Sequence, residues 1–332
     1  MIRRAPKNVV VIGGGTGSFA VLRGLKDRVE NLTALVGMAD DGGSTGVLRD
    51  ELGVLPPGDV RQCLVALSDA SDELRDLFNY RFENGGLEGH SFGNLFLSAV
   101  EKVAGSFGDA VRIAGDVLRV KGRVVPITLD DVRLKITLGD GRQLRGEHHI
   151  DTAQLHTNHT PPQIQLEPEA RITPEANEAI RTADLIVIAP GDIYTSLGPL
   201  LTVQGVAEAL QATKAKVAYV CNLVTKPGHT DGFSVASHAT EIERFAGGPI
   251  LDYVLYNTAR PDPALFERYK REGELLVPTD TIRPSKKQHH KTIGTNLLAP
   301  GVTTSRSGDQ LAHNRSFIRH DGNAVANVLL RL

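Results

Sequence analysis

The join between the first apolar run and the glycines after it restricts the fold more than any other feature. Residues Asn8 to Ile12 are mostly β-branched and lead directly into Gly13-Gly14-Gly15-Thr16-Gly17. Apolar residues then recur at helical spacing as far as Leu25, and a second apolar run covers Asn31 to Met38. A strand, a glycine turn, a helix and a second strand in this order predict a βαβ unit, which implies a parallel sheet with helices on both faces.

The remainder of the chain extends this pattern and interrupts it once. Helical spacing dominates residues 47–120, and a period-two apolar pattern with the tight turn Gly139-Asp140-Gly141 follows. We interpret residues 121–150 as a small β-hairpin insertion, after which strands and helices alternate again. The prediction is one large α/β domain over residues 1–332, a Rossmann-like parallel sheet covered by helices on both faces, with residues 280–312 forming an irregular basic loop.

Composition narrows the class of protein. The longest unbroken apolar runs have five residues, for example Cys63 to Leu67. A bilayer span needs about 20, so no transmembrane helix is expected. Two cysteines fit a reducing compartment, and no secretory apolar segment follows the basic first residues, so we expect a soluble cytoplasmic protein. A net charge of −2, no tryptophan and 5% aromatic residues argue against nucleic-acid binding.

The first glycine loop predicts an anion site. Free backbone N–H groups and the dipole at the start of a helix favour an anion, typically a phosphate, and glycines allow its close approach. Read as G-x-G-x-x-A, Gly15, Gly17 and Ala20 loosely match a dinucleotide fingerprint, and Asp40 lies where a ribose-binding acid would fall. The strict fingerprint fails because Ser18 stands at its third glycine. The alternative is a turn with a purely structural role.

A second loop, Asp40-Asp41-Gly42-Gly43-Ser44-Thr45-Gly46, follows the second strand. Adjacent carboxylates at a strand end can coordinate Mg²⁺ beside a phosphate or accept ribose hydroxyl groups. Asp59, in the turn from Pro56 to Arg61, fits a helix N-cap. Asp40, Asp41 and Asp59 are therefore the candidate metal ligands if the protein is a transferase. The alternative is an acidic loop whose hydroxyl residues cap a helix.

Three further polar motifs stand next to predicted strand ends or helix starts. Hydroxyl, amide and imidazole groups at a helix N-terminus suit an anion or sugar hydroxyls, and a lysine adds positive charge. Helix capping alone is the alternative for Ser91. The candidate binding residues in these motifs are His90, Ser91, Asn94, Gly191, Tyr194, Thr195, Ser196, Asn222 and Lys226.

A group of histidines raises a separate metal hypothesis. His148, His149, His156 and His159 lie close together with Asp151 between them. Such a group can bind Zn²⁺, but its spacing matches no helix face and no zinc finger. We therefore expect a loop rather than a metal site there.

Six strings of the sequence resemble, in order and spacing, the YvcK-like gluconeogenesis factors of bacteria, within the CofD-like superfamily. They are Val11 to Gly17, Ala39 to Gly46, Pro56 to Arg61, Gly89 to Asn94, Pro190 to Ser196 and Asn222 to Gly228. The resemblance implies a cytoplasmic Rossmann-like protein that binds a UDP-sugar, notably UDP-N-acetylglucosamine, with a link to cell shape and cell-wall precursor supply during gluconeogenic growth. It attaches no reaction to these proteins. The superfamily sibling 2-phospho-L-lactate transferase moves a phospholactyl-type group with Mg²⁺.

Two more positions take their role from the resemblance alone. Tyr269 matches a family tyrosine, and Arg319-His320-Asp321 matches a family string near the C-terminus. Tyr269 and Arg319 are thereby implied as UDP-sugar contacts, since a tyrosine can stack on uracil and an arginine can bind a pyrophosphate. A half-buried helix tyrosine and a surface arginine are the alternatives. The segment from Thr279 to Gln310 departs from the family pattern because it is longer and more basic.

Three functions from different classes follow. The first is a regulatory protein that binds a nucleotide-sugar. Its expected partners are proteins of cell-wall synthesis and, in a homodimer, a second copy of the chain, and no cofactor is assigned to it. The second is a Mg²⁺-dependent transferase of phosphate-linked groups. The third is an NAD-dependent oxidoreductase, which the loose fingerprint and Asp40 favour.

Overall fold

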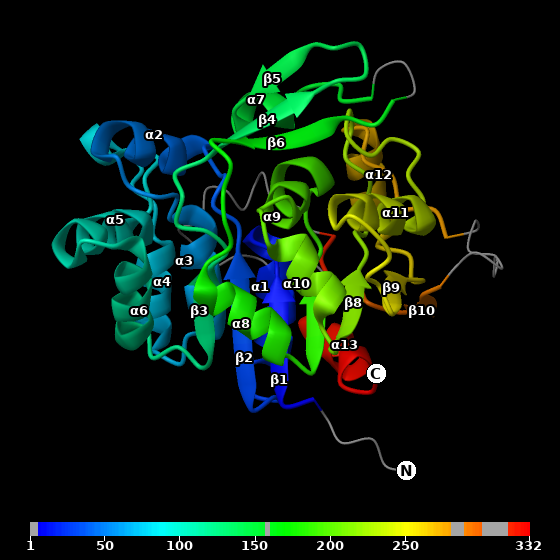
Figure 1. The fold of residues 1–332 in the computed structure, drawn as a ribbon, viewed down its shortest axis with the longest axis horizontal. Coiled ribbons are helices and arrows are strands. Elements are labelled where there is room, and N and C mark those ends of the chain that lie inside the picture. Colours follow the sequence, from blue (N-terminus) through cyan, green and yellow to red (C-terminus); the bar gives the residue numbers. More distant parts are fainter. Residues whose placement is uncertain (1–5, 157–159, 280–288, 301–317) are drawn as a thin grey trace.

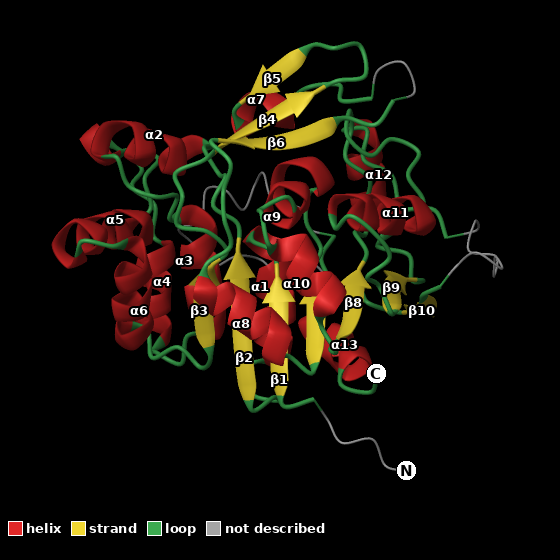
Figure 2. Ribbon diagram, viewed as in Figure 1, coloured by secondary structure: helices red, strands yellow, loops and turns green. Residues whose placement is uncertain are grey.

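The computed structural model describes residues 6–156, 160–279, 289–300 and 318–332. Their centre is a seven-stranded sheet in which every neighbouring pair runs parallel (Figure 1, Figure 2). In sheet order the strands are β10 (Lys291–Thr295), β9 (Tyr253–Asn257), β8 (Lys216–Val220), β7 (Leu185–Ile188), β1 (Asn8–Ile12), β2 (Asn31–Val36) and β3 (Arg123–Pro126). The predicted Rossmann-like parallel sheet is therefore confirmed.

The order of the strands reverses beside β1. The chain leaves β1 toward β2 and β3, returns to β7 on the other side of β1, and continues outward to β8, β9 and β10. The connections that follow β1 and β7 therefore diverge. In open α/β sheets this switch point leaves a crevice at the carboxyl ends of the two strands, which is where such proteins bind ligands.

Helices cover both faces of the sheet. One buried cluster joins the sheet to α1, α3, α4, α5, α6 and α13, and another joins it to α8, α9, α10 and α11. The helices are α1 (Gly15–Leu25), α2 (Gly43–Leu52), α3 (Gly58–Leu67), α4 (Asp72–Asn79), α5 (Phe92–Ala104), α6 (Phe107–Val117), α7 (Glu147–Asp151), α8 (Pro174–Thr182), α9 (Gly198–Leu201), α10 (Val206–Ala212), α11 (Val235–Phe245), α12 (Pro263–Arg271) and α13 (Gly322–Leu329), with a 3-10 turn at Gly85–Leu87 and a π turn at Ile193–Leu197.

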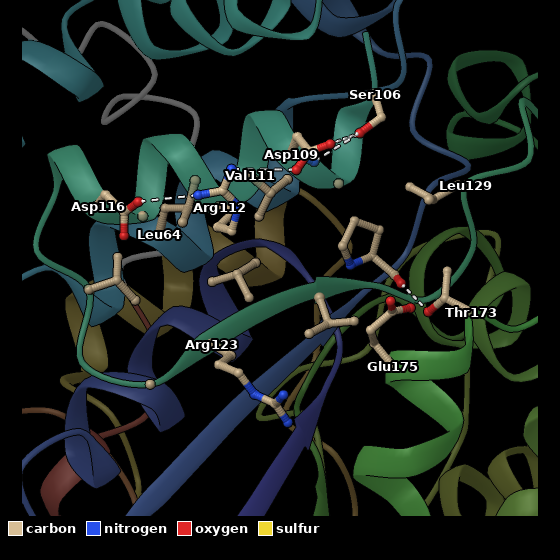
Figure 3. Close-up of a pocket in the computed structure, with 17 residues that line it drawn as sticks. Leu64, Ser106, Asp109, Val111, Arg112, Asp116, Arg123, Leu129, Thr173 and Glu175 are labelled. Carbon is tan, nitrogen blue, oxygen red and sulfur yellow. Dashed lines mark hydrogen bonds and ion pairs between the residues drawn. The ribbon is translucent and has the colours of Figure 1, made fainter. Parts of the chain in front are cut away.

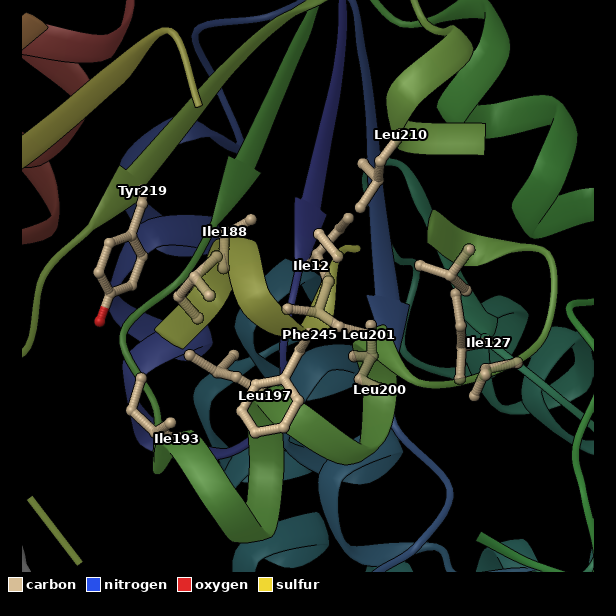
Figure 4. Packing of buried hydrophobic residues seen from close by; sticks show 14 of the residues in the cluster. Ile12, Ile127, Ile188, Ile193, Leu197, Leu200, Leu201, Leu210, Tyr219 and Phe245 are labelled. Atoms are coloured by element: carbon tan, nitrogen blue, oxygen red, sulfur yellow. The ribbon is translucent and has the colours of Figure 1, made fainter. Parts of the chain in front are cut away.

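Alternate residues of each central strand enter opposite clusters, because side chains alternate across a strand. Val9 and Val11 of β1 pack with the α1 and α3 side, whereas Val10 and Ile12 pack with the α9 and α10 side. Figure 4 shows Ile12 among the leucines that follow β7. A strand that is buried on both faces has a continuous run of apolar residues in its sequence, and β1 has such a run.

The first and the last described helices touch backbone to backbone. A Cβ atom placed on Gly24 of α1 would lie 2.0 Å from the carbonyl oxygen of Gly322 of α13, and one placed on Gly322 would lie 2.1 Å from the carbonyl oxygen of Ala20. Two glycines thus allow α13 to approach α1 more closely than side chains would permit.

The β insertion differs in its boundaries from the prediction for residues 121–150. Its antiparallel sheet has the order β5 (Gln143–Arg145), β4 (Arg133–Thr137) and β6 (Gln163–Glu167), and Figure 1 places it above the carboxyl ends of the main strands. Residues 123–126 instead form β3, which pairs with β2 at the edge of the main sheet. A run of only two valines carries no period that separates an edge strand from a hairpin.

The region predicted as an irregular basic loop, 280–312, lies mostly outside the described residues. Its described part contains β10, which pairs with β9 over Lys291–Thr295, so the prediction of irregular structure is wrong for this stretch. The sequence pattern of a strand is weak over these residues, because β10 is a half-exposed edge strand that contains a glycine. No described helix combines the length and the apolar character that a bilayer crossing requires.

Candidate functional site

The loops that follow β1, β2, β7 and β8 meet at the carboxyl edge of the sheet. A Cβ atom on Gly17 of the first loop would lie 2.0 Å from the carbonyl oxygen of Pro190, which follows β7. Asn222, which follows β8, donates from Nδ2 to the carbonyl oxygen of Gly191 at 2.8 Å and accepts the Gly191 N–H at 3.3 Å. The structure therefore brings the predicted glycine motifs into direct contact.

The start of α1 is already approached by a carboxyl group. The helix begins at Gly15, whose φ of +66° suits glycine, and the Gly15 N–H is hydrogen-bonded to the side chain of Asp59. A Cβ atom on Gly14 would lie 1.8 Å from Asp59 Oδ2, so this glycine makes room for the aspartate. Thr16 is exposed beside it. A phosphate bound here has to share the helix N-terminus with a carboxyl group, which a bridging cation or a bound proton would permit.

A cavity of about 130 Å³ lies below the insertion and is lined by three carboxyl groups, those of Asp40, Asp59 and Glu147, together with Thr195 and Ser196. Burial raises the pKa of Asp59 to about 7, and the charge of Asp40 adds to the rise. Burial also raises the pKa of Glu147 well above its usual range, and the charge of Asp40 and a hydrogen bond with it contribute. Asp59 and Glu147 therefore hold protons more readily than exposed carboxyl groups do, and a positive ion beside them would favour their ionised forms.

Glu147 is a site residue that the sequence analysis missed. It is the first residue of α7 in the insertion, far along the chain from the aspartates, and no glycine motif marks it. Asp41, predicted as the partner of Asp40, lies against the insertion instead: it accepts the His148 N–H at 3.1 Å and lies 3.7 Å from Arg133. The two adjacent aspartates thus have different surroundings, because side chains of neighbouring residues in extended chain diverge.

Replacement of Asp59 by asparagine is expected to reduce the pH dependence of stability. The native pKa of about 7 exceeds the ordinary value of 3.8, so the native state binds this proton more tightly than the unfolded chain does. The stabilisation is present at low pH and is lost as the pH rises from about 4 through about 7. The free energy of unfolding is measured by urea denaturation at pH 5 and at pH 8. Between these two pH values it should fall by about 2 to 3 kcal/mol more in the wild type than in Asp59→Asn. Equal losses would contradict the raised pKa.

A hydrogen-bond network connects the loop after β2 to the start of α5. Ser44 Oγ lies 2.9 Å from His90 Nδ1 and accepts from Asn94 Nδ2 at 3.3 Å. Asn94 Oδ1 in turn accepts from Nε of the buried Arg61 at 3.0 Å. Ser91 caps α5 through the Asn94 N–H, as the capping interpretation expects. In the same loop Gly43 is the first residue of α2, and Thr45 lies against Gly58. Ser44 and His90 are the polar groups of this network that stay partly exposed.

The loop after β7 binds its own carboxylate. Asp192 Oδ1 accepts the N–H groups of Tyr194 and Thr195 at 2.8 and 2.9 Å, and Asp192 Oδ2 lies 2.8 Å from Lys226 Nζ. Burial opposes ionisation of Asp192, but the hydrogen bond with His229 and the charge of Lys226 outweigh it and hold its pKa far below the usual range. The carboxylate of Asp192 therefore already accepts two of the N–H groups of this loop and pairs with Lys226.

Tyr194 and Lys226 have structural partners in this part of the chain. The Tyr194 side chain is fully buried, and its hydroxyl group lies 3.1 Å from His156 Nε2 and donates to Glu241 at 3.3 Å. Lys226 also pairs with Asp151 of α7. These contacts connect the insertion to the loops after β7 and β8 and leave Thr195 and Ser196 as the residues of this loop that line the cavity.

Tyr269 and Arg319 lie together beside the end of β8. Tyr269 is buried against Leu223 and Ile318, and its hydroxyl oxygen accepts the Ile318 N–H at 3.3 Å. Arg319 is exposed, and the next residue, His320, is hydrogen-bonded through Nε2 to the carbonyl oxygen of Cys221 at 3.2 Å. Burial lowers the pKa of His320 to about 4, so it is neutral at pH 7. The structure thus places the two positions that the resemblance adds near Asn222.

The predicted histidine group is divided in the structure. His148 and His149 lie in α7, a short helix where a loop was expected, and His156 contacts Tyr194. His159 lies outside the described residues. Within the described part of the chain, these histidines and Asp151 do not form a set of three ligands close enough for one metal ion.

A larger cavity, of about 590 Å³, lies away from these loops, along the outer edge of β3 between α6 and the start of α8. Figure 3 shows Arg112 on its wall, paired with Asp109 and Asp116 of the same helix. No residue of the glycine loops and no predicted site residue lines this cavity. Its larger volume is therefore no reason to assign the functional site to it.

The parallel sheet, its switch point and the loops that meet there define a Rossmann-like α/β protein. The chain belongs to the CofD family: the family model described as 2-phospho-L-lactate transferase CofD matches residues 9–298. A gluconeogenesis factor of Listeria innocua is 37% identical over 335 residues, covering 100% of this chain and 97% of the relative. A gluconeogenesis factor of Halalkalibacterium halodurans is 42% identical over 314 residues, covering 94% of each. A crystal structure of a Bacillus halodurans protein matches with a TM-score of 0.88 and 37% identity, covering 99% of this chain and 100% of that one.

Proposed function

We propose that the chain is a regulatory protein that binds a nucleotide-linked sugar, UDP-N-acetylglucosamine in the first place, at the crevice outside β1 and β7. The observation that carries this proposal is the meeting of the loops after β1, β2, β7 and β8 at the switch point of the sheet. Doubly wound α/β proteins bind nucleotides at this place. Relatives named gluconeogenesis factor support a role in gluconeogenic growth. Cell shape and cell-wall precursor supply are the outputs that we propose for this role.

The proposed site divides into two ends. At the β8 end, the exposed Arg319 supplies a guanidinium group for a pyrophosphate, and Tyr269 holds the backbone in front of it through Ile318. At the β2 end, Ser44 and His90 supply hydroxyl and imidazole groups for a sugar or a phosphate. The first glycine loop lies between the two ends. A ligand with a nucleotide at one end and a sugar at the other matches this distribution.

A second candidate function is a Mg²⁺-dependent transferase, which the buried carboxyl groups favour. Mg²⁺ prefers oxygen ligands, and Asp40, Asp59 and Glu147 offer carboxyl oxygens around one cavity. Burial, and after it the charge of Asp40, raises the pKa values of Asp59 and Glu147 there. The oxygen chemistry of these residues fits the ion, but in the described part of the chain their three carboxyl groups do not all approach within 4.8 Å of one another, so water would complete the set of ligands. The bound ion would neutralise phosphate charge beside the first glycine loop, and Asp59 would then be held in its ionised form. Membership of the CofD family supports this alternative.

Calorimetric titration of the purified chain with UDP-N-acetylglucosamine, with and without Mg²⁺, tests both candidates. We expect saturable binding with the nucleotide recovered intact, and no heat with NAD. Arg319→Ala should weaken binding by about tenfold or more, since hydrogen bonds to charged groups contribute about 1.5 to 3 kcal/mol. Arg112→Ala is the matched control, because Arg112 is an exposed arginine of the distant cavity.

Each other result points to a different conclusion. If Arg319→Ala binds the UDP-sugar with unchanged affinity, Arg319 is a surface arginine that does not contact the ligand. Breakdown of the nucleotide only when Mg²⁺ is present would establish the transferase and make Asp40 and Asp59 the first residues to replace. Binding of NAD in preference to the UDP-sugar would contradict both candidates.

A further inference from the structure

Two histidines and a glutamate meet at the outer edge of the main sheet, away from the loops of the proposed site. Glu243 lies in the last turn of α11, and His289 and His290 directly precede β10. One potential ligand atom from each of the three side chains lies within 4.8 Å of the other two, and no other trio of His, Cys, Asp or Glu in the described ranges is this close. Figure 1 places α11 and β10 on the same side of the molecule.

The carboxylate of Glu243 is fixed in orientation. Its Oε1 accepts the N–H groups of Ile250 and Leu251, each at 3.0 Å, in the turn that leads to β9. The same oxygen lies 2.7 Å from Nε2 of His289. Backbone donors that hold a carboxylate in this way are typical of the outer shell of metal sites, where they keep a ligand in place before the ion binds.

His290 carries an unsatisfied nitrogen. Its Nδ1 is inaccessible to solvent and has no hydrogen-bond partner within the described structure. Leaving a buried polar group without a partner costs about 1 to 3 kcal/mol, so such groups are rare in native proteins. The His290 imidazole lies beside His289 and Glu243, and a metal ion that bound there through Nδ1 would supply the missing partner. The two imidazole rings lie with their centroids 5.1 Å apart and nearly perpendicular.

We propose that Glu243, His289 and His290 form a zinc site, with water as the fourth ligand. Two imidazole nitrogens and one carboxylate are a ligand set of zinc, whereas Mg²⁺ and Ca²⁺ prefer oxygen ligands throughout. Tetrahedral ligands around zinc lie about 3.3 Å apart, so the ion replaces the proton between His289 and Glu243 with a small outward shift of the two side chains. The bound ion links the end of α11 to β10, which pairs only with β9 among the described strands.

Zinc titration of the metal-free full-length chain, in competition with a coloured chelator, tests this site. We expect one equivalent of tight binding in the wild type and an affinity lower by about 100-fold or more in His289→Ala and His290→Ala, since even outer-shell changes cost about 10- to 100-fold. Glu243→Gln should also bind weakly, while its amide oxygen still accepts the N–H groups of Ile250 and Leu251. Zinc should raise the Tm of the wild type and leave that of the variants unchanged. Circular dichroism spectra equal to that of the wild type would show that the variants are folded.

The double variant His148→Ala/His149→Ala is the matched control, because it removes the other adjacent pair of histidines, whose ring centroids lie 6.0 Å apart. It should retain the single equivalent of zinc. Retention of that equivalent by His289→Ala/His290→Ala, or its loss from the control, would overturn the proposal. A wild type that binds zinc no more tightly than His289→Ala/His290→Ala would overturn it as well.

Discussion

Gly17→Ala is expected to lower the free energy of unfolding by about 3 kcal/mol or more. The new Cβ atom would lie 2.0 Å from the carbonyl oxygen of Pro190 and 2.8 Å from its carbonyl carbon, and backbone cannot rotate away as a side chain can. Overpacking of a close contact typically costs about 1 to 3 kcal/mol, and a contact with backbone lies at the upper end. Alanine gains about 1 kcal/mol over glycine in a helix, which is too little to compensate. Urea denaturation measures the difference.

Gly115→Ala is the control for this prediction. Gly115 also lies inside a helix, α6, but its added Cβ atom would meet Leu64 at an ordinary 3.9 Å. This variant should be as stable as the wild type or more stable by up to about 1 kcal/mol. If Gly17→Ala matched Gly115→Ala, the first loop and the Pro190 loop would not be in contact, and the predicted phosphate-binding role of Gly17 would have to be separated from its packing.

Asp192→Ala should destabilise the protein by about 3 to 5 kcal/mol, the loss typical when one partner of a buried ion pair is removed. The substitution leaves Lys226 without one of its carboxylates. It also removes the partner of Nδ1 of the buried His229 and the acceptor of the N–H groups of Tyr194 and Thr195. Asp192→Asn should cost less, because the amide oxygen still accepts the two N–H groups. Chemical denaturation at pH 7 checks the order of the three proteins.

Asp116→Ala provides the comparison for Asp192→Ala. Asp116 is an exposed member of an i,i+4 pair with Arg112, a kind of pair that contributes about 0.3 to 0.5 kcal/mol. The pH dependence adds a second check. Because the pKa of Asp192 is depressed, its stabilisation is present above the ordinary pKa of 3.8 and is lost as the pH falls below that value. Equal stability of the two alanine variants at pH 7 would contradict the described network.

Much of the fold could be predicted from the sequence, for a physical reason. Residues Asn8–Ile12 are apolar on both faces, and a turn that needs glycine follows them, so one short segment carries both the strand and its connection. Parallel strands then place every motif at a strand end on one edge of the sheet. The grouping of the loops around Gly17, Gly191 and Asn222 follows from these local signals, and the structure confirms the contacts among them.

The parts that could not be predicted depend on long-range contacts. Glu147 lines the cavity only because the insertion folds back over the strand ends. No motif in the neighbouring sequence predicts this position. Asp192 accepts two of the N–H groups in the loop after β7, and in the sequence it cannot be told from any other acidic residue of a turn. The edge strands β3 and β10 are short and half-exposed, so tertiary pairing rather than periodicity decides them.

The contact between Gly24 and Gly322 has a consequence for how the protein is made. During synthesis the N-terminal part of a chain leaves the ribosome first and begins to fold first. One partner of α1 is α13, so one face of α1 stays uncovered until all the residues between these two helices have been translated. The central pair β1 and β7 is likewise completed late, since the chain returns to β1 only after β3 and the insertion. An interrupted nascent chain therefore exposes apolar surface beside its glycine loop, and chaperones that bind such surface would recognise this intermediate.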